Sequence, residues 1–296
     1  MADTPLELAR AAADYMAERG LENARLEAEL LLASVLGLSR LELYLQHDRP
    51  LTAEEKEAFR ARVRRRLKRE PLQYIVGEAQ FRELRLRVDP RVLIPRPETE
   101  VLVGEVLKWA SARAGDGADS ADGLSAVDIG TGSGAIALSL AKEGPFARVV
   151  ATDVSADALE VARENARRLE LDARVEFRHG ALWDALRPGE RFDVVVSNPP
   201  YVAEAERASL APEVAEWEPA QALFASGGGL DVIAALVDGA PDRLRPGGLL
   251  ALEIGLGQAE AVVERIERRG AYGRPRVVKD LAGRERVVLA EAGPLA

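Results

Sequence analysis

The stretch FDVVVSNPPY, residues 192–201, contains a run of β-branched residues that stops at an asparagine followed by two prolines. A short continuous apolar run such as Val194, Val195 and Val196 is typical of a strand that is buried on both faces of a parallel sheet. Ligands of open α/β sheets bind beyond the carboxyl ends of such strands. We therefore expect Asn198 to stand at the ligand-binding edge of a sheet.

The four residues Asn198, Pro199, Pro200 and Tyr201 offer hydrogen-bond acceptors and a flat aromatic ring. The two prolines fix φ and remove two backbone donors, which leaves carbonyl oxygens free to accept. Such a site suits a planar group that carries N–H donors, either an amide or a nucleobase amine. The alternative interpretation is a strand-ending turn without a role in binding.

The composition is that of a globular protein, with 47% hydrophobic and 30% charged residues in a chain of 296. The chain has no cysteine, which excludes disulfides, and neither His47 nor His179 has a second ligand at metal-binding spacing. We therefore expect no metal site. The N-terminus lacks the pattern of a signal peptide and no apolar run is long enough to span a bilayer, so we expect a cytoplasmic protein.

The net charge of −9 argues against a protein that binds nucleic acid chiefly by neutralising phosphates. One basic stretch, RARVRRRLKR at residues 60–69, is a candidate for a local basic face. Its simpler interpretation is the solvated face of a helix.

Strands and helices alternate from residue 124 onward, which predicts a doubly wound, mostly parallel sheet. A closing pair of strands is expected at 275–279 and 286–290. The other expected strands lie at 126–129, 148–152, 174–178, 192–197 and 249–254, and the expected helices lie at 136–142, 156–169, 230–244 and 258–269.

Residues 1–75 predict a small helical bundle, in which Thr4 and Thr52 start helices as capping residues followed three positions later by Glu. Residues 76–97 are expected to form a linker with a β-hairpin, made of strands 81–88 and 92–94 around a turn at 89–90. A second domain of residues 98–296 should begin with a helix at 98–112. The stretch GDGADSADG, 115–123, has the composition of a flexible linker.

A glycine-rich turn, DIGTGSG at residues 128–134, follows the first expected strand of the sheet. Glycines at a strand-to-helix turn let a ligand approach the backbone closely. The spacing Gly-x-Gly-x-Gly differs from the Gly-x-Gly-x-x-Gly of dinucleotide binding, which favours a different adenosine-bearing cofactor.

Asp153 ends the second expected strand, about 20 residues after the glycine-rich turn, where an acidic side chain accepts hydrogen bonds from ribose hydroxyls. Its alternative role is a charge at the N-terminus of the helix that Ser155 would cap. Trp183, in the loop after the third strand, either packs on the adenine or covers the edge of the sheet.

These features together resemble class I S-adenosylmethionine-dependent methyltransferases, and Asn-Pro-Pro-Tyr resembles the members that methylate planar nitrogens. The resemblance sharpens to the release factor glutamine methyltransferases over nearly the whole chain. The motifs that carry it are IPRPETE at 94–100, DIGTGSGAIALSLA at 128–141, VVSNPPY at 195–201, LAPEVAEWEPAQALF at 210–224 and KDLAGRERVV at 279–288.

The resemblance implies a Rossmann-like class I methyltransferase sheet that methylates the glutamine side-chain amide in the Gly-Gly-Gln motif of peptide chain release factors. The methyl donor is then S-adenosyl-L-methionine. The implied cofactor positions are Gly130, Thr131, Gly132, Ser133, Gly134, Asp153, Trp183 and Asn198, and the implied substrate positions are Asn198, Pro199, Pro200 and Tyr201.

In this interpretation the catalytic residues are Asn198, Pro199 and Tyr201. The Asn198 side-chain oxygen and the Pro199 carbonyl would accept the two amide hydrogens, and Tyr201 would pack over the amide plane. The chain departs from the family after Gly180, because Ala181 and Leu182 stand where relatives often carry an acidic residue near the adenine.

Two other functions stay open on the residues. An adenine-amino methyltransferase acting on DNA or RNA would use the same site after flipping the base, although the acidic balance counts against it. A non-catalytic cofactor-binding scaffold would have no use for the combination of the glycine-rich turn, Asp153 and Asn198. We expect a monomer that docks its protein substrate through the N-terminal helices and binds neither nucleic acid stably nor a membrane.

Overall fold

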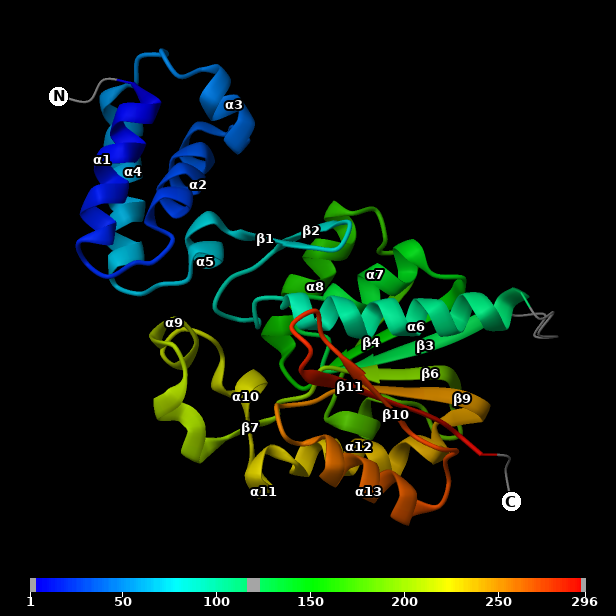
Figure 1. Cartoon of the computed structure of the whole chain (residues 1–296). Coiled ribbons are helices and arrows are strands. Elements are labelled where there is room, and N and C mark those ends of the chain that lie inside the picture. Colours follow the sequence, from blue (N-terminus) through cyan, green and yellow to red (C-terminus); the bar gives the residue numbers. More distant parts are fainter. Residues whose placement is uncertain (1–3, 116–122, 294–296) are drawn as a thin grey trace. The chain divides into compact units, whose positions relative to one another are not determined.

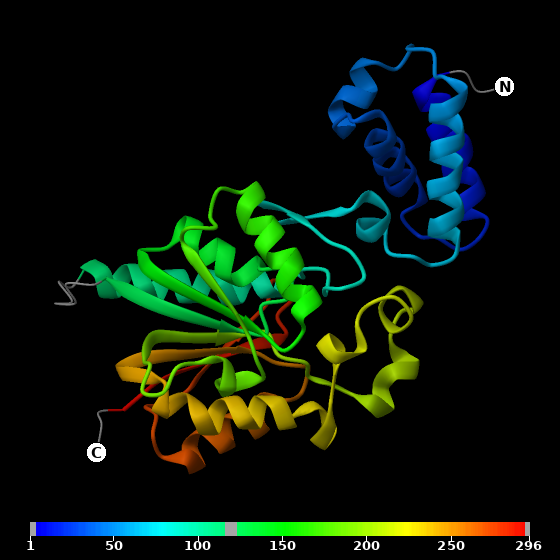
Figure 2. The same ribbon diagram turned by 180° about the vertical axis from the view of Figure 1, so that it is seen from behind.

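The computed structural model describes residues 4–115 and 123–293, and the chain divides into two compact units (Figures 1 and 2). One unit comprises Met1–Glu78 and Ala211–Trp217, and the other comprises Ala79–Leu210 and Glu218–Ala296. Residues 116–122, which make up most of the expected flexible linker, lie outside the described residues.

The first unit is built from helices around a core that includes the fully buried side chains of Met16, Leu31 and Phe59. The predicted helix starts at Thr4 and Thr52 are confirmed, and at Thr52 the hydroxyl accepts from the Glu55 N–H at 3.2 Å. The helices are α1 Pro5–Ala17, α2 Ala24–Leu36, α3 Arg40–Leu45, α4 Ala53–Leu67, α5 Leu72–Val76 and α9 Pro212–Ala215.

Arg66 of the basic stretch is paired with carboxylates of its own unit. Arg66 is only 6% exposed, and its guanidinium donates to Glu27 at 2.6 Å and to Glu213 at 3.0 Å. Because a buried charge is costly unless it is paired, the contact with Glu213 holds the distant segment Ala211–Trp217 to α4, and the contact with Glu27 holds α2. Arg66 therefore has a packing role and does not belong to the solvated face that the sequence pattern predicts.

The second unit contains a seven-stranded sheet in the order β10-β11-β9-β6-β3-β4-β5. Neighbours from β9 to β5 are parallel, whereas β11 pairs antiparallel with both β9 and β10. This confirms the predicted mostly parallel sheet with an antiparallel closing pair. The strands are β3 Leu124–Ile129, β4 Phe146–Asp153, β5 Val175–His179, β6 Phe192–Ser197, β9 Leu244–Glu253, β10 Arg276–Lys279 and β11 Glu285–Glu291.

Helices cover both faces of this sheet (Figure 1). On β6, the side chains of Val194 and Val196 pack in the core on one face of the sheet, and the side chain of Val195 packs in the core on the opposite face. The apolar run of β6 is therefore buried on both sides, as its composition predicts. One face carries α6 Pro97–Gly115, α7 Ala135–Glu143 and α8 Ala156–Arg168, and the other carries α12 Asp231–Gly239 and α13 Ala259–Arg269.

Shorter elements follow the strands at their carboxyl ends. Strands β7 Val202–Ala203 and β8 Phe224–Ala225 form a parallel pair, which brings the chain back beside the end of β6. The remaining short helices are η1 Leu182–Ala185, η2 Glu204–Ser209, α10 Ala220–Leu223, α11 Ser226–Gly229 and η3 Ala240–Asp242. No helix in the described part of the chain is long and apolar enough to cross a membrane.

The hairpin differs from its prediction. It consists of β1 Glu78–Phe81 and β2 Leu84–Arg87, and residues 92–94 form no strand. The alternating run breaks at Arg82, where φ is +49°. Its backbone N–H donates to Glu100 at 3.0 Å and its guanidinium to Glu143 at 2.6 Å, so partners that are distant in sequence stabilise the turn.

Asn165 of α8 connects the hairpin to the turn that follows β3. Its side chain is fully buried, accepts from the Arg87 N–H at 2.7 Å and donates to the Arg87 carbonyl at 3.0 Å. The same amide nitrogen donates to the Ser133 carbonyl at 2.9 Å. Three backbone groups are thus satisfied by one side chain.

We expect Asn165→Ala to lower the free energy of unfolding by about 2–4 kcal/mol, because it removes the partner of the buried Ser133 carbonyl and of two part-buried backbone groups of Arg87. Urea denaturation measures this change. The matched control is Glu164→Ala, which removes only a partly exposed ion pair with Arg87 and should cost about 1 kcal/mol or less. Equal losses in the two variants would contradict the linking role of Asn165.

Candidate functional site

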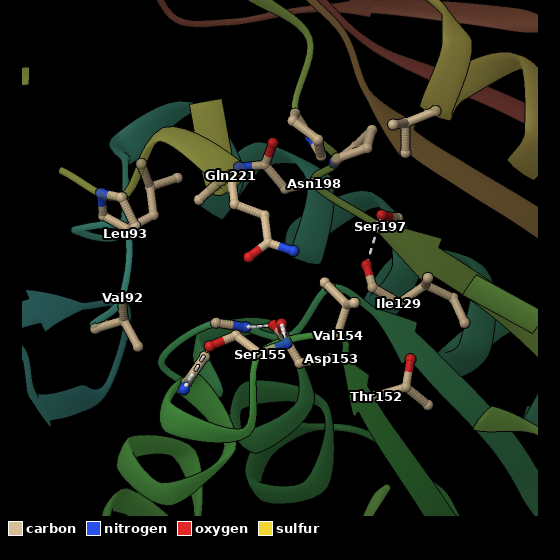
Figure 3. Close-up of a pocket in the computed structure, with 18 of the residues that line it drawn as sticks. Val92, Leu93, Ile129, Thr152, Asp153, Val154, Ser155, Ser197, Asn198 and Gln221 are labelled. Carbon is tan, nitrogen blue, oxygen red and sulfur yellow. Dashed lines mark hydrogen bonds between the residues drawn. The ribbon is translucent and has the colours of Figure 1, made fainter. Parts of the chain in front are cut away.

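The carboxyl ends of β3, β4 and β6 meet at one edge of the sheet, where they open into a cavity of about 360 Å³ (Figure 3). This volume is within the range of small-molecule sites. Of the residues predicted from sequence, the structure brings six together on the cavity wall: Gly130, Gly132, Asp153, Asn198, Pro199 and Pro200.

The glycine-rich turn presents its backbone to this cavity. Gly130 and Gly132 have φ of +77° and +54°, and a Cβ on either would meet no atom of the chain within 4 Å. The Gly132 N–H donates to Asp153 Oδ2 at 2.9 Å, while Asp153 Oδ1 accepts from the Ser155 N–H at 2.9 Å. Burial raises the pKa of Asp153. Asp153 therefore fixes the turn and the start of α8 while facing the cavity.

Three residues of the turn do not line the cavity and shape the turn from behind. The Thr131 hydroxyl donates to Asp128 Oδ2 at 2.6 Å, the Ser133 carbonyl accepts from Asn165, and Gly134 caps α7. Asp128 itself is fully buried, and burial raises its pKa to about 7. In this structure Thr131, Ser133 and Gly134 support the turn, and their contacts with a cofactor stay predictions.

Asn198 stands at the end of β6, which Ser197 ties to β3 by donating to the Ile129 carbonyl at 2.6 Å (Figure 3). The Asn198 side-chain N–H₂ donates to the Thr99 hydroxyl oxygen at 3.0 Å. The Thr99 hydroxyl in turn donates to Glu253 Oε2 at 2.6 Å. The first turn of α6 and the end of β9 therefore orient the Asn198 amide.

Tyr201 ends the stretch that begins at Asn198. It is not among the residues that line the cavity, and its ring packs against the core formed with α12 and α13. Its hydroxyl donates to Glu253 Oε1 at 3.1 Å, and its carbonyl accepts from the Gln258 side chain at 2.9 Å. In this structure Tyr201 therefore contacts the residues that support the site, and its packing over a substrate plane stays a prediction.

Trp183 also points away from the cavity. Its indole N–H donates to the Ala235 carbonyl of α12 at 3.1 Å, and its ring packs in the core on that face. Leu182 lines the cavity in its place, together with Ala181 and Gly180. Of the two roles that the sequence left open, the structure places Trp183 in the packing of the sheet.

The opposite wall comes from residues 91–93 and 219–224, to which sequence reasoning gave no role. Val92 and Leu93 are apolar, and Figure 3 shows the Gln221 amide directed into the cavity. Arg96 and Glu218 hold the two segments together through an ion pair of 2.5 Å. The motifs at 94–100 and 210–224 are the signal that could have identified this wall.

Glu253 and Thr99 are the other residues that sequence reasoning missed. Glu253 is 0% exposed and Thr99 is 3% exposed. Burial raises the pKa of Glu253 to about 7, and the Tyr201 hydroxyl beside it has a raised pKa as well. An acidic residue at the end of an apolar strand was the available signal for Glu253.

Sequence comparisons match this chain to known proteins along nearly its whole length. The PrmC N-terminal domain matches residues 7–77, and the methyltransferase small domain matches residues 118–246. A release factor glutamine methyltransferase of Geobacter sulfurreducens is 47% identical over 256 residues, which are 86% of each chain. The chain belongs to the release factor glutamine methyltransferase family.

A second family member, from Rhodopirellula baltica, is 39% identical over 289 residues, which are 97% of this chain and 96% of the relative. The resemblance drawn from the motifs is therefore confirmed. Among solved structures, a T. thermophilus 16S rRNA N2 G1207 methyltransferase in complex with AdoMet and guanosine matches with a TM-score of 0.53. That match has 22% identity, covers 73% of this chain and 49% of the other, and concerns the fold.

The raised pKa of Asp128 in this family member predicts a pH-dependent stability. Its folded pKa of about 7 exceeds the ordinary value of 3.8, so its protonation stabilises the folded state at low pH and this contribution is lost as pH rises through 7. The free energy of unfolding of Asp128→Asn, relative to that of the parent, should rise by on the order of 2 kcal/mol from pH 5 to pH 7 and stay constant above pH 7. Urea denaturation across pH measures the difference, and a constant or opposite trend would contradict it.

Proposed function

We propose that this chain transfers a methyl group from S-adenosyl-L-methionine to the side-chain amide nitrogen of the glutamine in the Gly-Gly-Gln motif of peptide chain release factors. The observation that carries the proposal is the position of Asn198. It faces the same cavity as the glycine-rich turn, in a chain whose relatives are named for glutamine methylation.

The residues present fit the methyl donor. Gly130 and Gly132 leave open space over their backbone, and the Asp153 carboxylate faces the cavity with lone pairs suited to ribose hydroxyls. Val154 and Leu182 offer apolar surface for an adenine in place of the acidic contact that the chain lacks. S-Adenosylmethionine, when bound, supplies an electrophilic methyl group.

The amide nitrogen of glutamine is a poor nucleophile because its lone pair is delocalised into the carbonyl, so the site must fix its direction. The Asn198 side-chain N–H₂ is occupied by Thr99, which turns Oδ1 of the same amide away from Thr99. In our proposal this Oδ1 and the Pro199 carbonyl accept the two amide hydrogens. Their dipoles then stabilise the positive charge that develops on nitrogen, and the nitrogen loses its proton to water afterwards.

The remaining proposals concern the roles of the domains and of the supporting residues when the substrate is a protein. We propose residues 1–75 as a docking domain, 76–97 as a linker and 98–296 as the methyl-transfer domain. Pro200 stiffens the strand end, Tyr201 acts through its hydroxyl on Glu253, and Thr131, Ser133 and Gly134 shape the turn. Because release factors act in translation, we place the reaction in the cytoplasm, and the net charge of −9 favours a monomer that does not bind nucleic acid stably.

Methyl transfer to a release factor tests the substrate. With labelled S-adenosylmethionine, we expect incorporation into an intact release factor and none into a variant in which the Gln of Gly-Gly-Gln is replaced by Ala. DNA and RNA are offered in parallel as the planar-amine alternative. Label that enters nucleic acid, or that survives removal of the glutamine, would overturn the proposed function.

Two variants separate catalysis from cofactor binding. We expect Asn198→Ala to lower kcat by on the order of a hundredfold, because one preorganised acceptor is lost, while the Kd for S-adenosylmethionine changes little.

Asp153→Ala should instead raise the Kd for S-adenosylmethionine by roughly tenfold or more, since a charge-assisted hydrogen bond to ribose is lost. Steady-state kinetics and calorimetry measure the two effects. Normal turnover of Asn198→Ala, or unchanged affinity of Asp153→Ala, would remove that residue from its role.

A further inference from the structure

Glu253 is a buried carboxylate that contacts neither the cavity nor the reacting atoms in the reaction outlined above. It lies at the end of β9, and its two oxygens accept hydrogen bonds from side chains of two other segments, Thr99 of α6 and Tyr201 after β6. We propose that Glu253 is a positioning residue which, through the Thr99 hydroxyl, fixes which end of the Asn198 amide faces the substrate. This inference rests on the proposed function, since it explains how the acceptor in that site is oriented.

The direction of the hydrogen bonds carries the argument. An ionised carboxylate can only accept, so Glu253 Oε2 obliges the Thr99 hydroxyl to donate its single hydrogen there. The Thr99 oxygen is then left with lone pairs only, and it must receive a donor from Asn198. The donor is the Asn198 N–H₂, so Oδ1 is turned to the opposite side.

Orientation matters because the two ends of an asparagine amide have nearly the same shape and differ only in their hydrogen bonds. If the Asn198 amide turned over, it would present N–H₂ to a substrate that itself offers N–H donors. Two donors would then face each other in a partly buried site, which is unfavourable. A fixed acceptor two hydrogen bonds away prevents this arrangement.

The surroundings of Glu253 argue against a purely structural ion pair. Within the described part of the chain Glu253 forms no salt bridge, and its side chain has no exposed surface. The charged groups that act on it are Glu98, which raises its pKa, and Arg286, which lowers it. Tyr201 stabilises the charged form of Glu253 by donating to Oε1, and the charge of Arg96 acts to lower the pKa of Tyr201.

Protonation of Glu253 should reverse the chain of hydrogen bonds. Burial raises its pKa to about 7. Above that pH the carboxylate accepts from Thr99, whereas below it a protonated Oε2 can donate to the Thr99 oxygen. The Thr99 hydroxyl is then free to donate to Asn198 Oδ1 and to turn the amide over, so kcat should fall as pH drops below about 7.

Thr99 offers a matched pair of variants. Thr99→Val keeps the shape and removes the hydroxyl, and we expect it to lower kcat at pH 8 by about tenfold or more, with the KM for S-adenosylmethionine within about threefold. Thr99→Ser restores the hydroxyl and should return kcat to within about threefold of the parent. Equal kcat values for the Val and Ser variants would overturn the inference.

The pH profile gives a readout that a structural role would not move. Glu253→Gln should lower kcat at pH 8 by about tenfold and abolish the fall below pH 7, because the neutral amide does not titrate. Tyr201→Phe removes a hydrogen bond to the charged form, so the fall in kcat should begin at a higher pH. An unchanged midpoint in Tyr201→Phe, or an acid limb retained by Glu253→Gln, would contradict the role of Glu253.

An activity-independent measurement separates this inference from the proposed function. In the isotope-labelled protein, the Glu253 carboxyl ¹³C signal and the Asn198 side-chain ¹⁵N signal should titrate with one midpoint near pH 7, and the Asn198 shift should vanish in Thr99→Val. Absence of methyl transfer by the parent to a release factor defeats the proposed function, while the coupled titration still decides the inference. If the Asn198 signal does not change when Glu253 is protonated, the inference is overturned, even if the parent is active.

Discussion

A carboxylate without exposed surface, Glu253, holds three segments in register at the edge of the sheet. Thr99 enters from the start of α6 and Tyr201 from the turn after β6, and both donate to Glu253 at the end of β9. Without an acceptor at this point, two buried hydroxyls would have no fixed partner and the Asn198 amide would lose its orientation. Burying a carboxylate is unfavourable, and Glu253 stands where such a group orients the neutral amide of Asn198.

The cavity beside this network has two dissimilar halves. The glycine-rich turn and Asp153 expose backbone and a charged acceptor, whereas Val92, Leu93 and the 219–224 segment form a more apolar wall. Asp153 lines the cavity while it accepts hydrogen bonds from the Gly132 and Ser155 N–H groups. A donor with a polar ribose and an apolar purine fits such a division, and the Gln221 side chain is directed into the cavity between the two halves.

Much of this arrangement could be predicted from the sequence, because it depends on local patterns. The apolar run of β6 predicted its bounds and its burial on both faces, and the order of strands and helices predicted the sheet. The hairpin was predicted wrongly because Arg82 turns under the influence of Glu100 and Glu143, which no local pattern reveals. Trp183 and Tyr201 could each have faced the cavity or the core, and only packing against α12 and α13 decides between them. Glu253 looked like an ordinary polar residue at a strand end, since its partners lie far away in sequence.

Asn165 joins the glycine-rich turn to strand β2, none of whose residues lines the cavity. Linkage between coupled segments is reciprocal, so whatever steadies the Ser133 carbonyl also steadies the hydrogen bonds to Arg87. If ligand binding steadies the glycine-rich turn, amide hydrogen exchange in the backbone of the hairpin should therefore slow as well. In thermodynamic terms the hairpin belongs to the ligand-binding unit, although it contributes no atom to the cavity wall.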